Sequence, residues 1–229
     1  MMVTLEDLRR QTEGTASGRL QFALSIWSIS KPTYDEWVAL IEDAVSHFLA
    51  EIASRRHNFH DIGEDPLTSI LVLLLRAVGL RASSAVVNGN CDLSIEYDSY
   101  RWLGEAKIGD DVGKIYGGYL QLTSRYTTGY PEQNAGGILL YCVKSQALAA
   151  LEGWKAALRE AVPAANVTDG EHPLKFRSSD TCQSTGLPLR LVHMAMALKF
   201  EPQENIGKLT PAARGKARNA KAKAKLKGK

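Results

Sequence analysis

Two strand-like segments joined by a short turn restrict the fold of this chain more than any other feature. Residues 91–97 (CDLSIEY) and 101–108 (RWLGEAKI) alternate between apolar and polar side chains, as half-buried strands do. Asp98 and Ser99, which separate them, are turn-forming residues. A similar segment near 82–88 precedes the pair, so the sequence predicts a three-strand meander.

The two-residue turn also fixes the register of the hairpin. It places Tyr97 opposite Tyr100 and, further from the turn, Asp92 opposite Glu105. Strand alternation then divides the side chains between two faces. The charged face is expected to carry Asp92, Ser94, Glu96, Arg101, Leu103, Glu105 and Lys107. The opposite face is apolar enough to be core, with Leu93, Ile95, Tyr97, Trp102, Ala106 and Ile108.

The charged face suggests a metal site. Carboxylates that oppose each other across two strands repel unless a positive group lies between them. A divalent cation would resolve this repulsion at Asp92 and Glu105, and oxygen ligands suit Mg²⁺, with Mn²⁺ as a substitute. Lys107 would orient a water molecule or neutralise a phosphate, so the pattern predicts phosphodiester hydrolysis. The alternative is an exposed hairpin in which Glu96 pairs with Arg101 and Glu105 with Lys107.

A buried helix is expected just before the meander. Residues 66–78 are nearly all apolar, Asp65 is positioned to cap the helix, and Gly79 to end it. Glu64 and Asp65 would stand where a surface loop enters this helix. Capping and favourable interaction with the helix dipole explain these acids at least as well as catalysis does.

The remaining segments predict an α/β fold with a mixed sheet. Thr33 and Glu36 have capping-box spacing at the start of an amphipathic helix over 33–56. Residues 162–186 predict a long loop, in which Lys175 and nearby serines are more often solvated than bound to phosphate. The other expected elements are a helix near 114–126, a buried strand at 136–143, a surface helix at 145–162 capped by Ser145, and a strand at 188–200 added at the sheet edge.

The charge distribution separates a basic tail from the rest of the chain. With 229 residues and 45% hydrophobic content, we expect one domain over 31–204, preceded by an extension over 1–30. The formal net charge is +3, but nine Lys or Arg and no acid follow Glu204, so residues 1–204 carry −6. Residues 205–229 are therefore predicted to form a flexible arm that either binds nucleic acid or serves as a solvated tail. Its predicted contacts are Lys216, Arg218, Lys221 and Lys223.

The cysteines and the N-terminus indicate a cytoplasmic setting. The three cysteines, Cys91, Cys142 and Cys182, are too few for a disulfide scaffold and lack zinc-ligand spacing. The first 14 residues are charged and lack the apolar core of a signal peptide, and no apolar run is long enough to span a bilayer. We expect no membrane association.

Residues 60–145 resemble the PD-(D/E)xK nuclease superfamily, which has a restriction-endonuclease-like fold. Its core runs helix, three-strand meander, helix, strand, and the segments above match that order. The resemblance implies that Asp92 and Glu105 bind the metal and that Lys107 is the catalytic lysine. The additional acid that many members place on the first core helix would be Glu64, with Asp65 as the rival.

The resemblance extends to the helix after the meander. Several members carry a glutamine there, which corresponds to Gln121. The next tyrosine, Tyr126, stands five residues later, whereas the RecB-like subgroup has a spacing of four. Lys114 and Arg125 on this segment are predicted to contact nucleic acid.

Taken together, these features predict a Mg²⁺-dependent endonuclease acting on DNA, with a setting in restriction or antiphage defence by family analogy. A chain without a module for reading sequence is expected to be controlled by a partner such as a helicase or ATPase, or by forming a homodimer. Two alternatives stay open. One is a non-catalytic nucleic-acid-binding or assembly subunit on the same fold; the other is a ribonuclease with a toxin-like role.

Overall fold

The structure is a computed structural model that describes residues 4–12, 14–86, 90–109 and 111–202. The chain divides into two units, residues 1–199 and residues 200–229. The fold presented below is that of the first unit.

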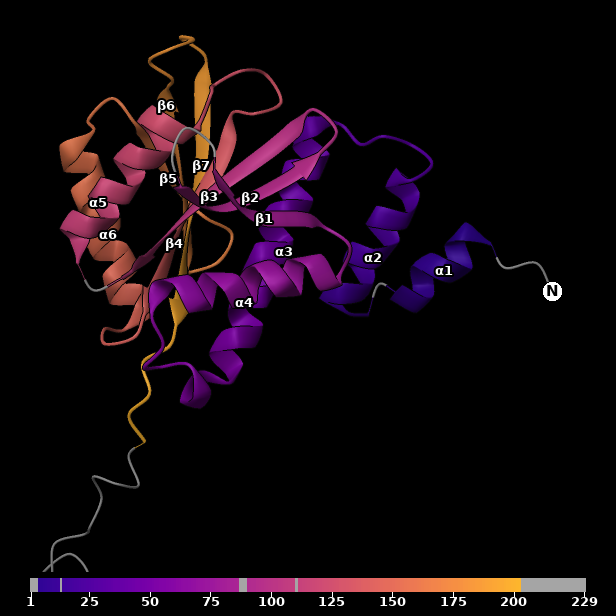
Figure 1. Ribbon diagram of the computed structural model, residues 1–229, viewed down its shortest axis with the longest axis horizontal. Coiled ribbons are helices and arrows are strands. Elements are labelled where there is room, and N and C mark those ends of the chain that lie inside the picture. Colours follow the sequence, from indigo (N-terminus) through magenta and orange to yellow (C-terminus); the bar gives the residue numbers. More distant parts are fainter. Residues whose placement is uncertain (1–3, 13, 87–89, 110, 203–229) are drawn as a thin grey trace, which may run out of the picture. The chain divides into compact units, whose positions relative to one another are not determined.

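A mixed sheet of seven strands, in the order β1-β2-β3-β4-β7-β6-β5, forms the centre of an α/β structure (Figure 1). β1, β2 and β3 form an antiparallel meander, β3, β4 and β7 run parallel, and β6 and β5 continue antiparallel. The strands are β1 (Arg81–Val86), β2 (Asn90–Tyr97), β3 (Tyr100–Ile108), β4 (Ala135–Cys142), β5 (Asn166–Asp169), β6 (Lys175–Thr181) and β7 (Pro188–Ala197).

Helices cover both faces of this sheet. α3 and α4 pack against one face and α5 and α6 against the other, and each side has its own cluster of buried apolar residues (Figure 1). Among the described residues, no helix is both long and apolar enough to cross a membrane. The helices are α1 (Leu5–Thr12), α2 (Ala16–Trp27), α3 (Tyr34–Ser54), the 3₁₀ turn η1 (Arg56–Asn58), α4 (Glu64–Ala77), α5 (Val112–Gln121), the π-helical turn η2 (Leu122–Tyr126) and α6 (Ala147–Ala161).

The predicted hairpin register and helix start are confirmed. Tyr97 pairs with Tyr100 across the turn, where Asp98 adopts a positive φ of 54°. Thr33 caps α3 in a reciprocal capping box with Glu36. The predicted order of helix, three strands, helix and strand is also present, as α4, β1 to β3, α5 and β4.

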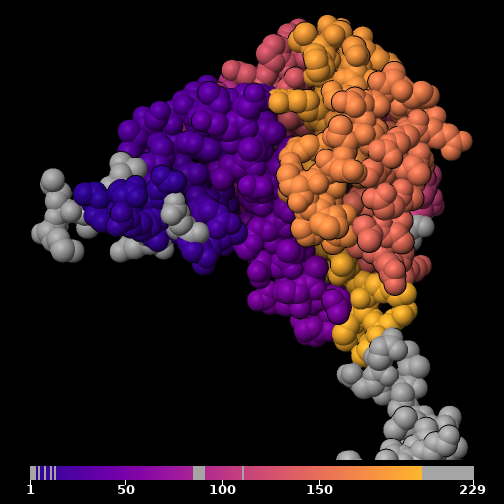
Figure 2. All heavy atoms as spheres, turned by 180° about the vertical axis from the view of Figure 1, so that it is seen from behind, coloured from indigo at the N-terminus to yellow at the C-terminus, as the bar shows by residue number. Residues whose placement is uncertain are grey.

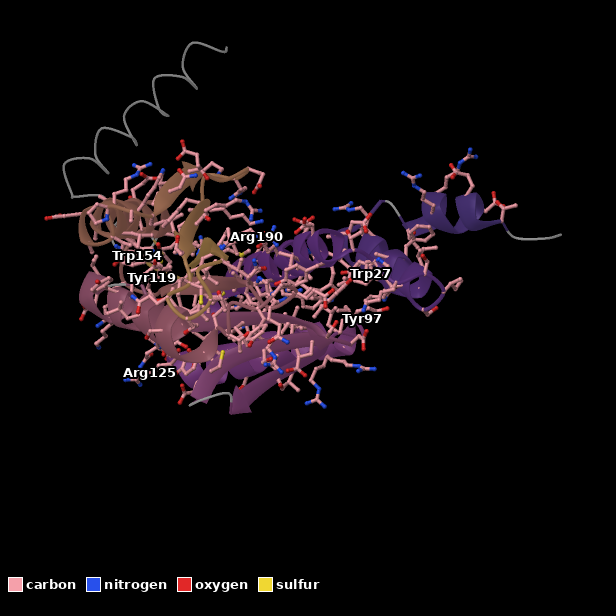
Figure 3. All side chains as sticks on the ribbon, turned by 90° about the horizontal axis from the view of Figure 1, so that it is seen from above. Trp27, Tyr97, Tyr119, Arg125, Trp154 and Arg190 are labelled. Carbon is pink, nitrogen blue, oxygen red and sulfur yellow. The ribbon has the colours of Figure 1, made fainter. Side chains whose placement is uncertain are left out.

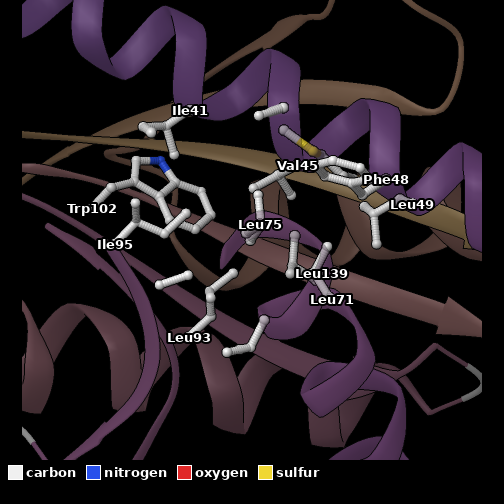
Figure 4. Packing of buried hydrophobic residues seen from close by; sticks show 14 of the residues in the cluster. Ile41, Val45, Phe48, Leu49, Leu71, Leu75, Leu93, Ile95, Trp102 and Leu139 are labelled. Carbon is white, nitrogen blue, oxygen red and sulfur yellow. The ribbon is translucent and has the colours of Figure 1, made fainter. Parts of the chain in front are cut away.

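The core lies mainly between the sheet and α3 and α4. Figure 4 shows side chains of both helices, among them Val45 and Leu71, in contact with strand residues such as Trp102 and Leu139. At 25 cal per Å² of apolar surface, each fully buried side chain of this size contributes about 2 kcal/mol. This cluster therefore holds α4 firmly against the meander.

The N-terminal segment packs on the same core. Leu20 of α2 is 3% exposed and belongs to the buried cluster. The Tyr97 hydroxyl donates to the carbonyl oxygen of Trp27 at 3.0 Å, and the two rings lie 6.0 Å apart between centroids (Figure 3). The apolar residues of the predicted extension thus cover the end of the hairpin.

The prediction that β7 lies at the sheet edge was wrong. β7 lies between β4, to which it is parallel, and β6, to which it is antiparallel. Such a strand is covered on both faces, and residues 191–196 are all buried.

Three local predictions are also corrected. Residues 162–186 are not a continuous loop, because they contain β5 and β6, whose polar residues are tolerated at the outer part of the sheet. Gly63, not Asp65, is the N-cap of α4, since the helix already begins at Glu64. The N-cap of α6 is Gln146 rather than Ser145.

Candidate active site

Four charged side chains from three elements meet at one point beside β3. The Lys107 Nζ lies 2.7 Å from Glu105 Oε1, 3.2 Å from Glu64 Oε1 and 3.6 Å from Asp92 Oδ2. Glu64 comes from α4, Asp92 from β2, and Glu105 and Lys107 from β3. The structure therefore brings together the three acids and the lysine predicted from the sequence.

Asp92 is positioned by a break in the strand ladder. The pairing between β2 and β3 extends from Tyr97 to Leu93 opposite Gly104. Beyond that pair, the Ala106 N–H donates to Asp92 Oδ2 at 2.9 Å instead of to a strand carbonyl. The carboxylate thus serves as a backbone acceptor, and this fixes its direction toward Lys107.

Glu64 reaches the site because it is the first residue of α4. Its Oε2 accepts the Ile108 N–H at 2.9 Å, so the helix start is bonded to the end of β3. Asp65 is exposed and makes no hydrogen bond with these residues. The structure therefore selects Glu64 as the upstream acid.

A buried hydroxyl pair supports Glu64, and sequence reasoning missed it. Thr68 Oγ1 lies 3.0 Å from the Glu64 carbonyl oxygen, to which it donates, and 3.0 Å from the Tyr141 hydroxyl. Burial raises the pKa of Tyr141, with the charges of Asp92 and Glu64 adding to the effect. The available clue was a hydroxyl residue within each of two otherwise apolar segments.

Glu105 is the most electrostatically perturbed acid of the site. It is 2% exposed, and its Oε2 is buried with no hydrogen-bond partner. Burial raises the pKa of Glu105 to about 7; the hydrogen bond from Lys107 opposes this shift, and the charge of Asp92 adds to it. A carboxylate in this position favours either a proton or a cation on its free oxygen.

Lys107 stays positively charged in this environment. Its burial favours the neutral amine, but the hydrogen bond and charge of Glu105, and the charges of Asp92 and Glu64, outweigh it and raise the pKa of Lys107. The ammonium also donates to the Ala106 carbonyl oxygen at 2.8 Å. The site as a whole holds three acids against one permanent cation.

Helix α5 approaches the site closely because residue 118 is glycine. A Cβ at this position would lie 3.0 Å from both Glu105 Cγ and Lys107 Cε. At Gly117, in contrast, a Cβ would meet no atom within 4 Å. The close packing expected of the glycine pair is therefore found at Gly118.

The spacing of five residues between Gln121 and Tyr126 has a structural explanation. The turn η2 is π-helical, with the Thr127 N–H donating to the Leu122 carbonyl oxygen, and such a turn accommodates one extra residue. Tyr126 is buried, and burial raises its pKa, followed by the charges of Glu105, Cys91 and Asp92. The π-helical turn thus keeps the tyrosine beside the acids.

The other predicted contact residues have different outcomes. Gln121 ends α5 and makes no hydrogen bond with the four charged residues. Lys114 and Arg125 are exposed and form no ion pair with a described residue, and Figure 3 shows Arg125 pointing outward. The predicted contacts Lys216, Arg218, Lys221 and Lys223 lie outside the described residues.

The donor set fits a hard divalent cation, although the lysine now takes that place. Within the described part of the chain, no group of three His, Cys, Asp or Glu side chains is arranged to hold a metal ion as it stands. The reason is that the Lys107 ammonium contacts all three carboxylates. Oxygen ligands and the unpartnered Glu105 Oε2 match what Mg²⁺ and Mn²⁺ prefer once the ammonium moves aside.

Comparison of the chain with family models, with curated proteins and with solved structures finds no match. The interpretation of this site therefore depends on its own geometry and chemistry.

Proposed function

We propose that this chain is a Mg²⁺-dependent endonuclease that hydrolyses phosphodiester bonds in DNA, built on a restriction-endonuclease-like core of the PD-(D/E)xK type. The observation that carries the proposal is the convergence of Glu64, Asp92 and Glu105 on Lys107, with one buried oxygen of Glu105 lacking a partner. Burying three acids at one point destabilises a fold unless a cation offsets their repulsion. One lysine offsets only part of it.

Each residue has a role that follows from its position. Glu64, Asp92 and Glu105 would hold Mg²⁺, or Mn²⁺ in its place, which when bound supplies Lewis-acid polarisation of the scissile phosphate. The backbone N–H groups of Ala106 and Ile108 keep two of these carboxylates oriented. Preorganised ligands of this kind avoid the cost of rearrangement during the reaction.

Lys107 acts as a cation rather than as a base. Because its pKa is raised, it does not release a proton near neutral pH and cannot abstract one from water. Its ammonium would instead stabilise negative charge that develops on the phosphate oxygens. This favours charge stabilisation over proton abstraction among the roles predicted for this residue.

The substrate contacts and the control of cleavage are part of the same proposal. Lys114 and Arg125 are exposed on the segment that packs over the site, and they would bind DNA phosphates. The basic tail would add electrostatic affinity for the same backbone. A helicase or ATPase partner, or a second copy of the chain, would supply the specificity in a restriction or defence setting.

The decisive experiment is plasmid cleavage by the purified chain with Mg²⁺, with Mn²⁺ and with EDTA. Glu105→Ala and Lys107→Ala are each expected to lower the cleavage rate by about a hundredfold or more, because each removes a charge at the reacting phosphate. Glu96→Ala and Lys144→Ala are matched controls, since both residues are exposed and lie outside the site. Both controls should cleave as the wild type does.

The same assay separates the alternatives. Equal DNA binding by all variants without cleavage in any metal would support the non-catalytic subunit and contradict the proposal. Cleavage of single-stranded RNA but not of single-stranded or duplex DNA would support the ribonuclease. Cleavage that survives in both site variants would remove the four-residue cluster from the chemistry.

A further inference from the structure

A cavity on the opposite face of the sheet from the candidate active site has the composition of a ligand pocket. It has a volume of about 320 Å³ and lies between α3 and the strands β6 and β7. In Figure 2 the purple helical surface adjoins the orange surface of the C-terminal strands, and the cavity lies along this boundary. Glu105 instead packs against α5, on the other face.

The charged groups that line the cavity are cationic. Arg56 and Lys175 both line it, and no carboxylate does. Neither side chain forms an ion pair or a hydrogen bond with a described residue. Two unpaired cations at one cavity favour an anionic ligand.

A third cation explains why Lys175 has no partner. The acids nearest to it in the fold are Glu42 and Glu171, and both bond to Arg177 instead, at 2.6 and 3.1 Å. Glu42 is 4% exposed, and its burial makes this pairing costly to break. Arg177 thus takes up both acids, and the ammonium of Lys175 remains available to a ligand.

Two neutral donors stand at the same cavity. His172 Nδ1 accepts the Leu174 N–H at 3.1 Å, so the ring proton of the neutral imidazole lies on Nε2. Ser46 also lines the cavity, and its hydroxyl has no hydrogen-bond partner among the described residues. Both groups therefore have hydrogen bonds to offer.

The floor of the cavity is apolar. Leu49 of α3, Leu174, and Met194 and Met196 of β7 line it. Methionine side chains are polarizable and adapt to planar rings. A volume near the lower end of ligand pockets suits one ring system with its sugar and phosphate, rather than a longer strand.

We propose that this cavity binds a mononucleotide, with the phosphate at Arg56 and Lys175 and the base on the Leu49, Met194 and Met196 floor. The inference goes beyond the proposed nuclease function and does not depend on it, since the two sites occupy opposite faces of the sheet. The ligand class follows from the combination of cations, donors and an apolar floor at one cavity.

The test is a binding titration of the full chain with a fluorescent AMP derivative, in EDTA so that metal-dependent binding at the candidate active site is excluded. Unlabelled AMP, adenosine and inorganic phosphate serve as competitors. AMP should compete at least about tenfold more strongly than adenosine or phosphate alone, because only AMP engages both the cations and the floor.

Variants assign the binding to this cavity. Lys175→Gln and Arg56→Gln should each weaken AMP binding by about tenfold or more. The matched controls Lys144→Gln and Arg76→Gln remove exposed cations elsewhere and should leave it unchanged. Ala53→Phe, which fills the cavity wall, should abolish AMP competition while phosphate still competes. Circular dichroism melting verifies that each variant is folded.

Three results would overturn the inference. The first is no AMP binding by folded wild-type protein at millimolar concentration. The second is binding that both cation variants retain. The third is a single-stranded oligonucleotide that outcompetes AMP equally in wild type and in Ala53→Phe, because binding would then follow the backbone charge and not the cavity.

Discussion

Glu105 and His193 are two buried polar side chains in one row across the sheet, and their surroundings differ in one respect. Ile138 of β4 pairs with Glu105 on one side and with His193 on the other. Both polar residues face the helices α5 and α6, and both are at most 2% exposed. The difference between them is the number of hydrogen bonds that each has.

Every polar atom of His193 has a partner. Trp154 Nε1 donates to its Nδ1 at 3.0 Å, Ser178 Oγ lies 2.8 Å from its Nε2, and the Phe176 ring stacks on it with centroids 4.1 Å apart. Burial lowers the pKa of His193 to about 3, so it is neutral. Glu105, in contrast, keeps one oxygen without a partner. A satisfied buried group stabilises a fold, whereas an unsatisfied one indicates a site that awaits a ligand.

Breaking the satisfied cluster should have the largest effect on stability. His193→Ala leaves a cavity and removes the partners of Trp154 and Ser178, so the free energy of unfolding should fall by about 4 kcal/mol. Urea denaturation at pH 7 measures this. His172→Ala, at an exposed histidine, should cost less than about 1 kcal/mol. Similar losses in the two variants would mean that the His193 cluster adds nothing beyond an ordinary surface contact.

The next effect has the opposite sign and tests the unsatisfied side. The pKa of Glu105 is raised from 4.5 to about 7 on folding. The protonated form therefore stabilises the native state below pH 4.5, and this stability is lost as pH rises through 7. Glu105→Gln removes the buried charge, so in EDTA at pH 8 it should raise the free energy of unfolding by up to about 3 kcal/mol.

At pH 4.5 the same substitution should give almost no gain, because Glu105 is then protonated in the native state. The control is Glu152→Gln, an exposed glutamate on α6, which should not change the shape of the profile. Unfolding followed from pH 4.5 to 8 provides the measurement. A Glu105→Gln variant that is less stable than wild type at pH 8 would mean that the ion pair with Lys107 outweighs the burial of the charge.

The local part of this comparison could be predicted from the sequence, and the long-range part could not. A two-residue turn and a period of two placed Asp92, Glu105 and Lys107 together, because these rules act over a few residues. The choice between Glu64 and Asp65 depends on the Ile108 N–H, which is 44 positions from Glu64 in the chain. No local rule contains that contact.

The position of β7 in the sheet is another long-range property. The segment from Leu191 to Met196 is apolar apart from His193, which indicates burial on both faces, yet the order of strands is not written in any one segment. The partners of His193 come from α6 and β6, both outside β7. Its structural role therefore became evident only once the topology was known.

The smallest expected effect uses two adjacent glycines of α5 to test how tightly the site is packed. Gly117→Ala places a methyl group in open space and gains helix propensity, so the free energy of unfolding should rise by about 1 kcal/mol. Gly118→Ala gains the same propensity, but its methyl lies 3.0 Å from Glu105 Cγ and Lys107 Cε. These atoms must shift by a few tenths of an ångström, which offsets the gain.

The pair should therefore separate stability from activity. Gly117→Ala is expected to melt at a higher temperature and to cleave plasmid at the wild-type rate. Gly118→Ala should gain little or no stability and should cleave about tenfold more slowly, because displaced site side chains no longer meet the phosphate in the reactive geometry. Equal rates in the two variants would show that Glu105 and Lys107 tolerate the displacement. The close approach of α5 would then stabilise the fold without positioning the site.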